Sequence, residues 1–338
     1  MNSLERYLKT IKREPLDYLA RVPIVMQYAA EYIGSNYGAF ASDYKVLVES
    51  NIRCVEDFGF DQLSVISDPY RETHGFGAEV EYLPDAVPRC TCLPMKGTKD
   101  FKLLKTPDPN SSERMLDRIN AIRSYKEKYD GKYSIMGWIE GPAAEAADVF
   151  GVSEFLTDIM LDESFIIELM DKCVDTAIDF ARVQLEAGAD TIGIGDAIAS
   201  QISPITYEAL IQPREKIIID AIKKMGGIVR LHICGNITHL LPGISGLDID
   251  ILDVDHLVDM KTVREIIGNE VVLSGNIDPV AGVKNGTPQS IRETMLQTYK
   301  EAGNPYMVNA GCEIPAGTPV ENLKALCEPI NWVEGNQY

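Results

Sequence analysis

Short, almost continuously apolar runs alternate along the chain with longer stretches in which apolar residues recur at helical spacing. Buried strands of a parallel sheet have this continuous apolar character, because both of their faces are covered. The stretches 155–187 and 205–225 predict helices, the first with a break near Asp162 and Glu163 and the second beginning after Ser203-Pro204. The expected strands are 23–27, 62–67, 133–140, 191–196, 228–234, 249–254, 271–275 and 306–310.

This alternation of strands and helices predicts an α/β fold class. Parallel strands need helical crossovers, and eight such units suggest closure into a single (β/α)8 TIM-type barrel domain over residues 1–338. A doubly wound open sheet is the alternative. The segment 76–109 is rich in Pro, Gly and turn residues, so we expect an irregular excursion near the top of the barrel there.

The ends of the predicted strands supply the candidate site residues, because barrel enzymes place their chemistry on the loops that follow the strands. For the carboxylates, hydrogen bonding to neighbouring loop amides is the structural alternative to a catalytic role. The candidates are Asp68, Glu140, Asp196, His232, Cys234, Asp255, Asn276, Asp278 and Cys312.

His232, Cys234 and Cys312 are the most informative of these candidates. A His-x-Cys pair places an imidazole and a thiol on one side of an extended chain, because alternate residues of a strand face the same way. With Cys312 as the third ligand, the set suits zinc and leaves one tetrahedral position open, as in catalytic zinc sites. The alternative is a buried cysteine beside a core histidine.

Composition and charge narrow the setting. A formal net charge of −19 disfavours nucleic acid as a partner. The chain has no apolar run long enough to span a membrane, and its first residues lack a signal-peptide pattern, so we expect a cytoplasmic protein that does not enter membranes. The seven scattered cysteines favour free or metal-bound thiols over a disulfide framework.

Four motifs stand in order along the chain: Ser67-Asp68-Pro69, Ile139-Glu140-Gly141-Pro142, Ser274-Gly275-Asn276-Ile277-Asp278-Pro279 and Gly317-Thr318-Pro319-Val320-Glu321-Asn322. Their order and spacing resemble those of the uroporphyrinogen decarboxylase superfamily, over about residues 15–329. This resemblance implies a single (β/α)8 barrel. The decarboxylases hold their tetrapyrrole with a segment of the form Arg-Gln-Ala-Gly-Arg-Tyr, but the corresponding stretch here, 26–32, lacks both arginines. Cys312 also replaces a histidine of the decarboxylases.

The other branch of the superfamily contains the zinc methyltransferases of corrinoid-dependent methyl transfer. Their metal motif is similar to His232, Cys234 and the distant Cys312. The resemblance implies Zn²⁺ on these residues, a corrinoid (cobalamin) carried by a partner protein, and a small methylated substrate. Asp68 matches the catalytic aspartate of the decarboxylases, and Glu140 and Asp196 are further candidate catalytic residues that could approach the metal.

Charges at the strand ends bear on the direction of methyl transfer. A coenzyme M sulfonate would require cations or amides, yet Arg71 and Arg230 are the few cations near the strand ends. We therefore expect demethylation of a small donor, such as an aryl methyl ether, with transfer to cob(I)alamin. The alternatives are a methylcorrinoid-to-thiol or tetrahydropterin methyltransferase, a metal-free decarboxylase-like lyase, and a non-catalytic barrel that docks on a corrinoid protein. Aromatic residues that could flank an aryl ether are Tyr28, Tyr70, Phe76, Trp138 and Tyr207.

The remaining sulfur and imidazole groups are of secondary interest. Cys90 and Cys92 could form a second metal pair with His74, although unliganded thiols are the favoured interpretation. His239 is expected to be a surface or capping residue. His256 could orient a substrate or a metal ligand.

Overall fold

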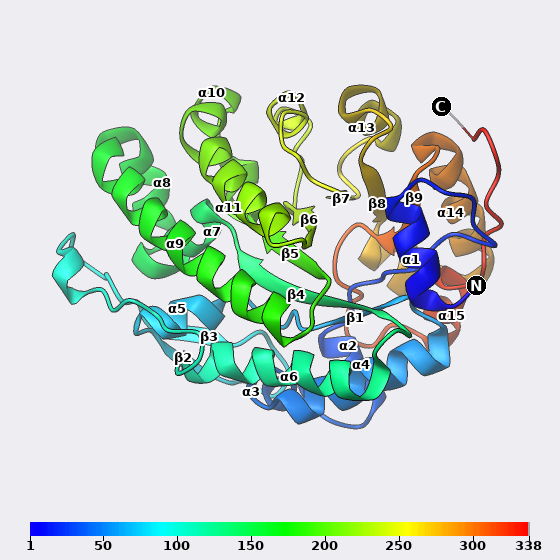
Figure 1. The fold of residues 1–338 in the computed structure, drawn as a ribbon, viewed down its shortest axis with the longest axis horizontal. Helices are drawn as coiled ribbons and strands as arrows, with labels where there is room; N and C mark the ends of the chain where they lie inside the picture. The colour runs from blue at the N-terminus through cyan, green and yellow to red at the C-terminus, as the bar shows by residue number, and fades with distance from the viewer. Residues whose placement is uncertain (337–338) are drawn as a thin grey trace.

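Seven parallel strands curl into one sheet, with helices outside them, in the computed structural model, which describes residues 1–336 (Figure 1). The strand order is β1-β4-β5-β6-β7-β8-β9, so each strand of this sheet pairs with the strand of the same sheet that follows it in sequence. This is the barrel-type α/β fold that the sequence predicts. The strands are β1 Gln62–Ser64, β4 Ser134–Glu140, β5 Thr191–Gly195, β6 Ile228–His232, β7 Ile251–Val254, β8 Val272–Ile277 and β9 Tyr306–Ala310.

The predicted first strand, 23–27, is wrong, because helix α2 already begins at Gln27 and 23–26 lie outside any strand. Pro23 explains this in part, since proline cannot donate a ladder hydrogen bond. Residues 20–22 take the place of the eighth strand. Arg21 forms an isolated parallel bridge with Val308 of β9. On its other side the Asp61 amide donates to the Arg21 carbonyl at 2.8 Å, and the Arg21 amide donates to the Asp61 carboxylate at 2.8 Å.

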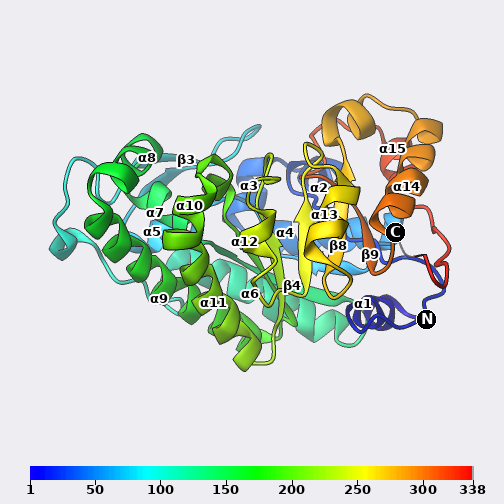
Figure 2. The same ribbon diagram turned by 90° about the horizontal axis from the view of Figure 1, so that it is seen from above.

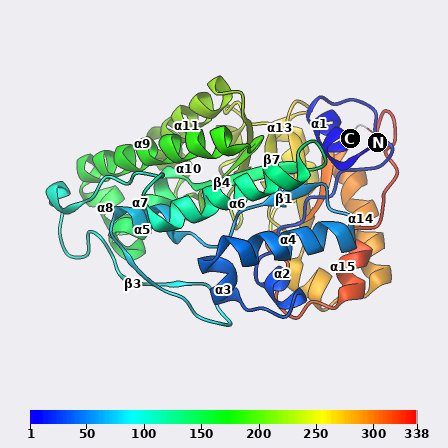
Figure 3. The same cartoon turned by 60° about the horizontal axis from the view of Figure 1, so that its bottom comes forward.

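Helices surround the sheet, with α4 and α6 side by side against β1 and β4, and α9 and α11 side by side further along (Figures 2 and 3). The predicted helix 155–187 is two helices that part at Asp162, whose side chain accepts from the Phe165 amide. The predicted helix 205–225 begins as α10, passes through a π-helical turn at Tyr207–Ile211 and continues as α11. The helices are α1 Ser3–Ile11, α2 Gln27–Tyr32, α3 Tyr37–Ser42, α4 Tyr44–Phe58, α5 Tyr70–Phe76, α6 Glu113–Tyr129, α7 Pro142–Phe150, α8 Val152–Leu161, α9 Glu163–Ala187, α10 Pro204–Thr206, α11 Gln212–Lys224, α12 Leu241–Ile244, α13 Met260–Ile267, α14 Pro288–Ala302 and α15 Val320–Leu326. Among the described residues, none of these helices has the length and apolarity needed to cross a membrane.

The segment 76–109 is irregular, as predicted. It contains only a short antiparallel hairpin, β2 (Glu79–Glu81) with β3 (Arg89–Cys92), and a 3-10 turn at Phe101–Leu103. Its Met95 amide donates to the Val149 carbonyl of α7 at 3.1 Å, which ties the excursion to the end of the barrel where the strands finish.

The two ends of the barrel interior differ in polarity. At the end where the strands begin, Tyr7 of α1 enters the interior and bonds to Thr191 at 2.9 Å. It packs there with a small apolar cluster of Ala20, Val22, Ile251, Val272 and Met307. Towards the other end the interior becomes polar, with Arg230, Asp253 and His232 all buried. The interior is therefore apolar where the strands begin, and these three titratable side chains lie toward the carboxyl ends of the strands.

We expect Asp61→Ala to lower the free energy of unfolding by about 3–5 kcal/mol, because it leaves the buried Arg6 and Arg21 without their shared carboxylate. Urea unfolding followed by circular dichroism measures this change. The control is Asp220→Ala, which removes an exposed pair with Lys216 and should cost less than about 1 kcal/mol. Equal losses in the two variants would contradict a structural role for Asp61 in closing the barrel.

Candidate metal centre

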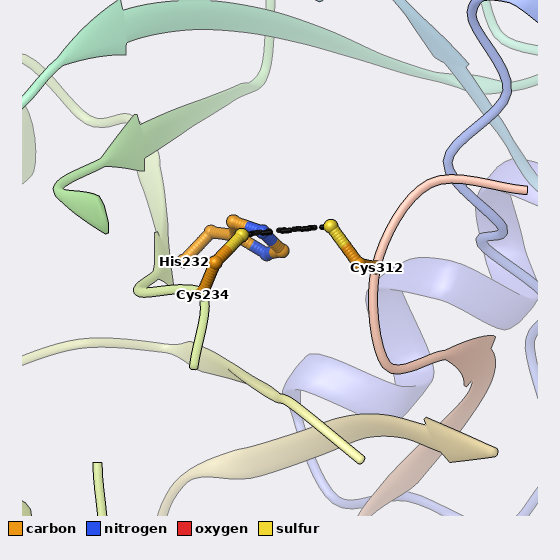
Figure 4. A group of neighbouring side chains, drawn as sticks. All are labelled: His232, Cys234 and Cys312. Atoms are coloured by element: carbon orange, nitrogen blue, oxygen red, sulfur yellow. Dashed lines mark hydrogen bonds between the residues drawn. The ribbon is translucent and has the colours of Figure 1, made fainter. Parts of the chain in front are cut away.

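The predicted metal ligands come together at the carboxyl ends of two strands. His232 is the last residue of β6, Cys234 follows two residues later, and Cys312 follows β9. His232 Nε2 lies 2.9 Å from Cys234 Sγ and 3.9 Å from Cys312 Sγ, and the two sulfurs are 3.5 Å apart. Figure 4 shows the His232 imidazole and the Cys234 thiol together on one side, with the Cys312 thiol pointing toward them from the other side.

This donor set fits a zinc ion. A tetrahedral zinc with bonds of about 2.3 Å to sulfur and about 2.0 Å to nitrogen separates its donors by about 3.5–3.8 Å. Two of the three separations, 3.5 and 3.9 Å, are close to that range, and the third, at 2.9 Å, is at hydrogen-bond distance. Among the residues that the structure describes, the His, Cys, Asp and Glu side chains that lie close enough together to hold one metal ion are these three.

The imidazole of His232 is oriented by a carboxylate behind it. His232 Nδ1 lies 3.0 Å from Asp253 Oδ2, which also accepts from Arg230 Nε at 2.8 Å. Burial opposes the charge on Asp253, but Arg230 and His232 outweigh it and hold the pKa of this carboxyl well below its usual range. Metal-binding histidines commonly donate their second ring N–H to a carboxylate, and this fixes which nitrogen faces the metal. Reasoning from sequence missed Asp253, although a charged residue inside an apolar strand is a readable signal.

The pKa values of the two thiols are shifted in opposite directions. The hydrogen bond with Cys234 lowers the pKa of Cys312 to about 4 against the effect of burial, and His232 adds to the lowering. The same hydrogen bond, together with burial, raises the pKa of Cys234. The lowered pKa of Cys312 favours its thiolate form, which is the form of a thiol that binds metal.

Glu140 and Trp138 line the barrel mouth beside the trio. Glu140 of β4 pairs in register with Gly195 of β5, which pairs with His232 of β6. Gly195 is needed here, because a Cβ at this position would lie 2.9 Å from the Trp138 ring and 3.1 Å from Glu140 Oε2. Trp138 makes an edge contact with the His232 ring and donates to Glu140 Oε1 at 3.0 Å. The structure thus brings Glu140 to the same side of the mouth as the metal ligands.

Behind Glu140 lies a buried group of acids that sequence reasoning missed. Arg71 Nη2 donates to Glu140 Oε1 at 2.6 Å, and Glu72 Oε1 accepts from the Glu140 amide at 3.0 Å. Burial raises the pKa of Glu140 well above its usual value, and Arg71 offsets only part of this effect. Burial also raises the pKa of Glu145 well above its usual value and that of Asp148 to about 7. A carboxyl group with a raised pKa can hold a proton, and it can then donate as well as accept a hydrogen bond.

The side chains of Asp68 and Asp196 form their hydrogen bonds with residues outside the trio, although the Asp196 amide donates to the His232 carbonyl at 3.0 Å. Arg114 donates to both carboxylate oxygens of Asp68 at 2.7 Å. Burial raises the pKa of Asp68, but this ion pair has the larger effect and holds that pKa well below its usual range. Asp196 accepts from the Ala144 amide at 2.7 Å at the start of α7, and burial raises its pKa to about 7. Their catalytic assignment stays a prediction.

Asp255 follows β7, Asn276 lies near the end of β8 and Asp278 follows β8, as predicted. All three lie around the residue His256 or the turn that carries it. Asp255 accepts from the Gly235 amide at 2.9 Å, beside the candidate metal ligand Cys234. The side chains of Asp255 and Asp278 lie on either side of the His256 ring. Asn276 donates to the backbone of the turn that carries His256.

The remaining predicted residues have structural partners. Arg71 and Arg230 are both buried in ion pairs with carboxylates. His239 lies 3.0 Å from the Ile202 carbonyl. Cys90 and Cys92 lie on the β2–β3 hairpin, and among the described residues they belong to no three-ligand group. Of the five aromatic residues, Trp138 has its ring in contact with His232, whereas Tyr28, Phe76 and Tyr207 are buried in the core and Tyr70 is half-buried.

A sequence profile of the uroporphyrinogen decarboxylase (URO-D) family matches residues 2–331, so the chain belongs to this family. One of its curated relatives is the methylcobamide:CoM methyltransferase MtbA of Methanosarcina mazei. The two sequences are 28% identical over 335 residues, which cover 96% of each chain. Another is the uroporphyrinogen decarboxylase of Microcystis aeruginosa, 24% identical over 92% of this chain and 93% of that one. Both kinds of enzyme are therefore similar over nearly the full length.

Solved structures support the same fold. A methyltransferase from Methanosarcina mazei superimposes with a TM-score of 0.87, at 23% identity over 96% of this chain and 97% of that one. A B12-independent methionine synthase from Shewanella superimposes with a TM-score of 0.56 at 13% identity, over 92% of this chain and 95% of that one. At these identities the likeness establishes the barrel fold of the chain.

We expect Asp253→Asn to weaken zinc binding by roughly 10- to 100-fold, because it removes the charge that orients His232 and raises its basicity. Competition with a chromogenic chelator measures the affinity. Ser274→Ala is the matched control, since Ser274 is the buried register partner of Asp253 on β8. Unchanged affinity in Asp253→Asn would show that this carboxylate does not support the site.

Proposed function

We propose that the protein is a zinc-dependent methyltransferase that exchanges a methyl group with the corrinoid of a partner protein. The observation that carries the proposal is the convergence of His232, Cys234 and Cys312, with Asp253 behind the histidine. Three ligands leave one coordination position for a substrate. The relatives named methylcobamide:CoM methyltransferases support the corrinoid and suggest a thiol acceptor.

In this proposal the chain prepares a thiol for attack on a methyl group. When bound, zinc would favour the thiolate form of a coordinated thiol at neutral pH. His232, Cys234 and Cys312 would hold the ion, and Glu140 and Trp138 would form the adjoining wall. The thiolate sulfur would then bond to the methyl carbon, while the carbon–cobalt bond breaks and cobalt keeps the electron pair. The sequence led us to expect the opposite direction, and the names of the relatives now favour the thiol.

The test combines metal content with methyl transfer. We expect one zinc per chain, and loss of methylcobalamin absorbance when 2-mercaptoethanesulfonate is added. Cys312→Ala should lose most of its zinc and at least about 100-fold of the transfer rate, because a ligand is missing. Cys90→Ala, at a half-buried cysteine away from the trio, should keep both. Full activity of the metal-free protein would contradict the proposal.

Demethylation of a small methylated donor is the second candidate. Arg71 and Arg230 already form ion pairs with Glu140 and Asp253. Neither guanidinium is therefore free to bind an anionic substrate. Such a mouth suits a neutral or cationic donor, as an aryl methyl ether or a methylamine would be. A cationic or neutral donor would transfer its methyl group to cob(I)alamin, and the leaving group would keep the electron pair of its bond to the methyl carbon.

A spectroscopic panel separates the two directions. Cob(I)alamin is mixed with the protein and with aryl methyl ethers, methylamines or methyltetrahydropterin, and formation of methylcobalamin is followed by its absorbance. We expect no conversion with these donors and rapid methylation of the thiol from methylcobalamin. Conversion with one donor and none with the thiol would establish the donor-side reaction instead.

A further inference from the structure

The side chain of His256 lies between two carboxylates at the mouth of the barrel. Its Nδ1 is 3.1 Å from Asp255 Oδ1, and its Nε2 is 3.6 Å from Asp278 Oδ2. The protonated ring can donate from both nitrogens, whereas the neutral ring can donate from only one. About a third of the side chain, 32%, is exposed, so small molecules in the mouth can reach it. The two carboxylates are the charged groups in the described chain that face this ring at ion-pair distance.

The turn that carries His256 is held rigidly. Asn276 Nδ2 donates to the carbonyl of Asp255 at 3.2 Å and to that of Val258 at 2.7 Å. The Leu257 amide donates to Asp255 Oδ1 at 2.9 Å, and the Val258 amide donates to the Asp255 carbonyl at 3.0 Å. Both ends of the turn are thus fixed by the same asparagine. A group that must exchange a proton in a defined place benefits from such fixed support.

This turn also touches both loops that carry the metal ligands. Asp255 Oδ2 accepts from the amide of Gly235, the residue after Cys234. On the other side lies Gly311, the residue before Cys312, where an added Cβ would be only 2.5 Å from the His256 amide nitrogen. The absence of a side chain at Gly311 therefore lets the Cys312 loop pass directly against the His256 turn.

Other groups near the trio already have partners. Asp253 is shared between Arg230 and His232, and Glu140 is bound by Arg71 and Trp138. His256 differs from these because it is partly exposed and its two ring nitrogens face the carboxylates of Asp255 and Asp278. Of these three side chains, His256 is therefore the one best suited to receive a proton.

We propose that His256 accepts the proton that a thiol substrate loses as its sulfur enters the open position beside Cys234 and Cys312. This inference rests on the proposed function. The S–H bond breaks, its electron pair stays on sulfur, and the proton forms an N–H bond on the neutral imidazole. Asp255 and Asp278 then neutralise the imidazolium. The retained electron pair on sulfur is the one that bonds to the methyl carbon.

The experiment counts protons. Binding of 2-mercaptoethanesulfonate to the zinc-loaded protein is followed by calorimetry in buffers of different ionisation enthalpy, which gives the number of protons released per thiol. We expect well below one proton for the wild type and about one for His256→Gln, with unchanged zinc content. Asp278→Asn, which removes one carboxylate and keeps the imidazole, should fall between them. His239→Gln, at a histidine bonded to the Ile202 carbonyl, should match the wild type.

The outcomes separate this inference from the proposed function. Equal proton release by the wild type and by His256→Gln, with the thiol bound in both, would overturn the role of His256 and leave the thiol methyltransferase standing. A wild-type protein that holds zinc but binds no thiol would overturn both. If His256→Gln lost its zinc, the Asp278→Asn variant would decide, since wild-type proton release in that variant would also overturn the proposal.

Discussion

Asp253 holds the centre of the barrel together by bonding to two side chains through one oxygen. Its Oδ2 accepts from Arg230 Nε at 2.8 Å and lies 3.0 Å from His232 Nδ1. All three groups are buried, so each charge depends on the others, and loss of one partner from such a cluster typically costs about 3–5 kcal/mol. Arg230 is further held by Gln62 Oε1 at 2.7 Å, which links β6 to β1 across the interior. The direction of the His232 ring, and with it the geometry of the metal site, follows from this arrangement.

Strand identity could be read from the sequence where both faces of a strand are buried. Seven of the eight predicted runs contain strands, because continuous apolar character reflects local burial. The closing segment could not be predicted in the same way. Arg21 is held on one side by Val308 and on the other by the side chain of Asp61, and this pairing depends on contacts between residues far apart in the chain. Pro23 was the local sign that the run 23–27 would not pair.

The convergence of His232, Cys234 and Cys312 could be predicted from the sequence, but the residues that support them could not. His232 and Cys234 are close in sequence, and family resemblance connected them to Cys312, which no local pattern could do. Asp253, Glu72 and the turn around His256 act through positions that only the folded barrel brings together. Asp68 shows the opposite case, since it lies in the loop between β1 and α5, beyond the end of the strand, and is engaged there by Arg114.

X-ray absorption at the zinc edge shows directly whether three side chains hold a zinc ion with one position open to a thiol. We expect two sulfur ligands at about 2.3 Å with nitrogen or oxygen completing the shell, and a third sulfur after addition of 2-mercaptoethanesulfonate. The corresponding Cys312→Ala protein should show at most one sulfur from the chain. A zinc shell that already has four protein ligands, or one that does not change when the thiol is added, would contradict the account.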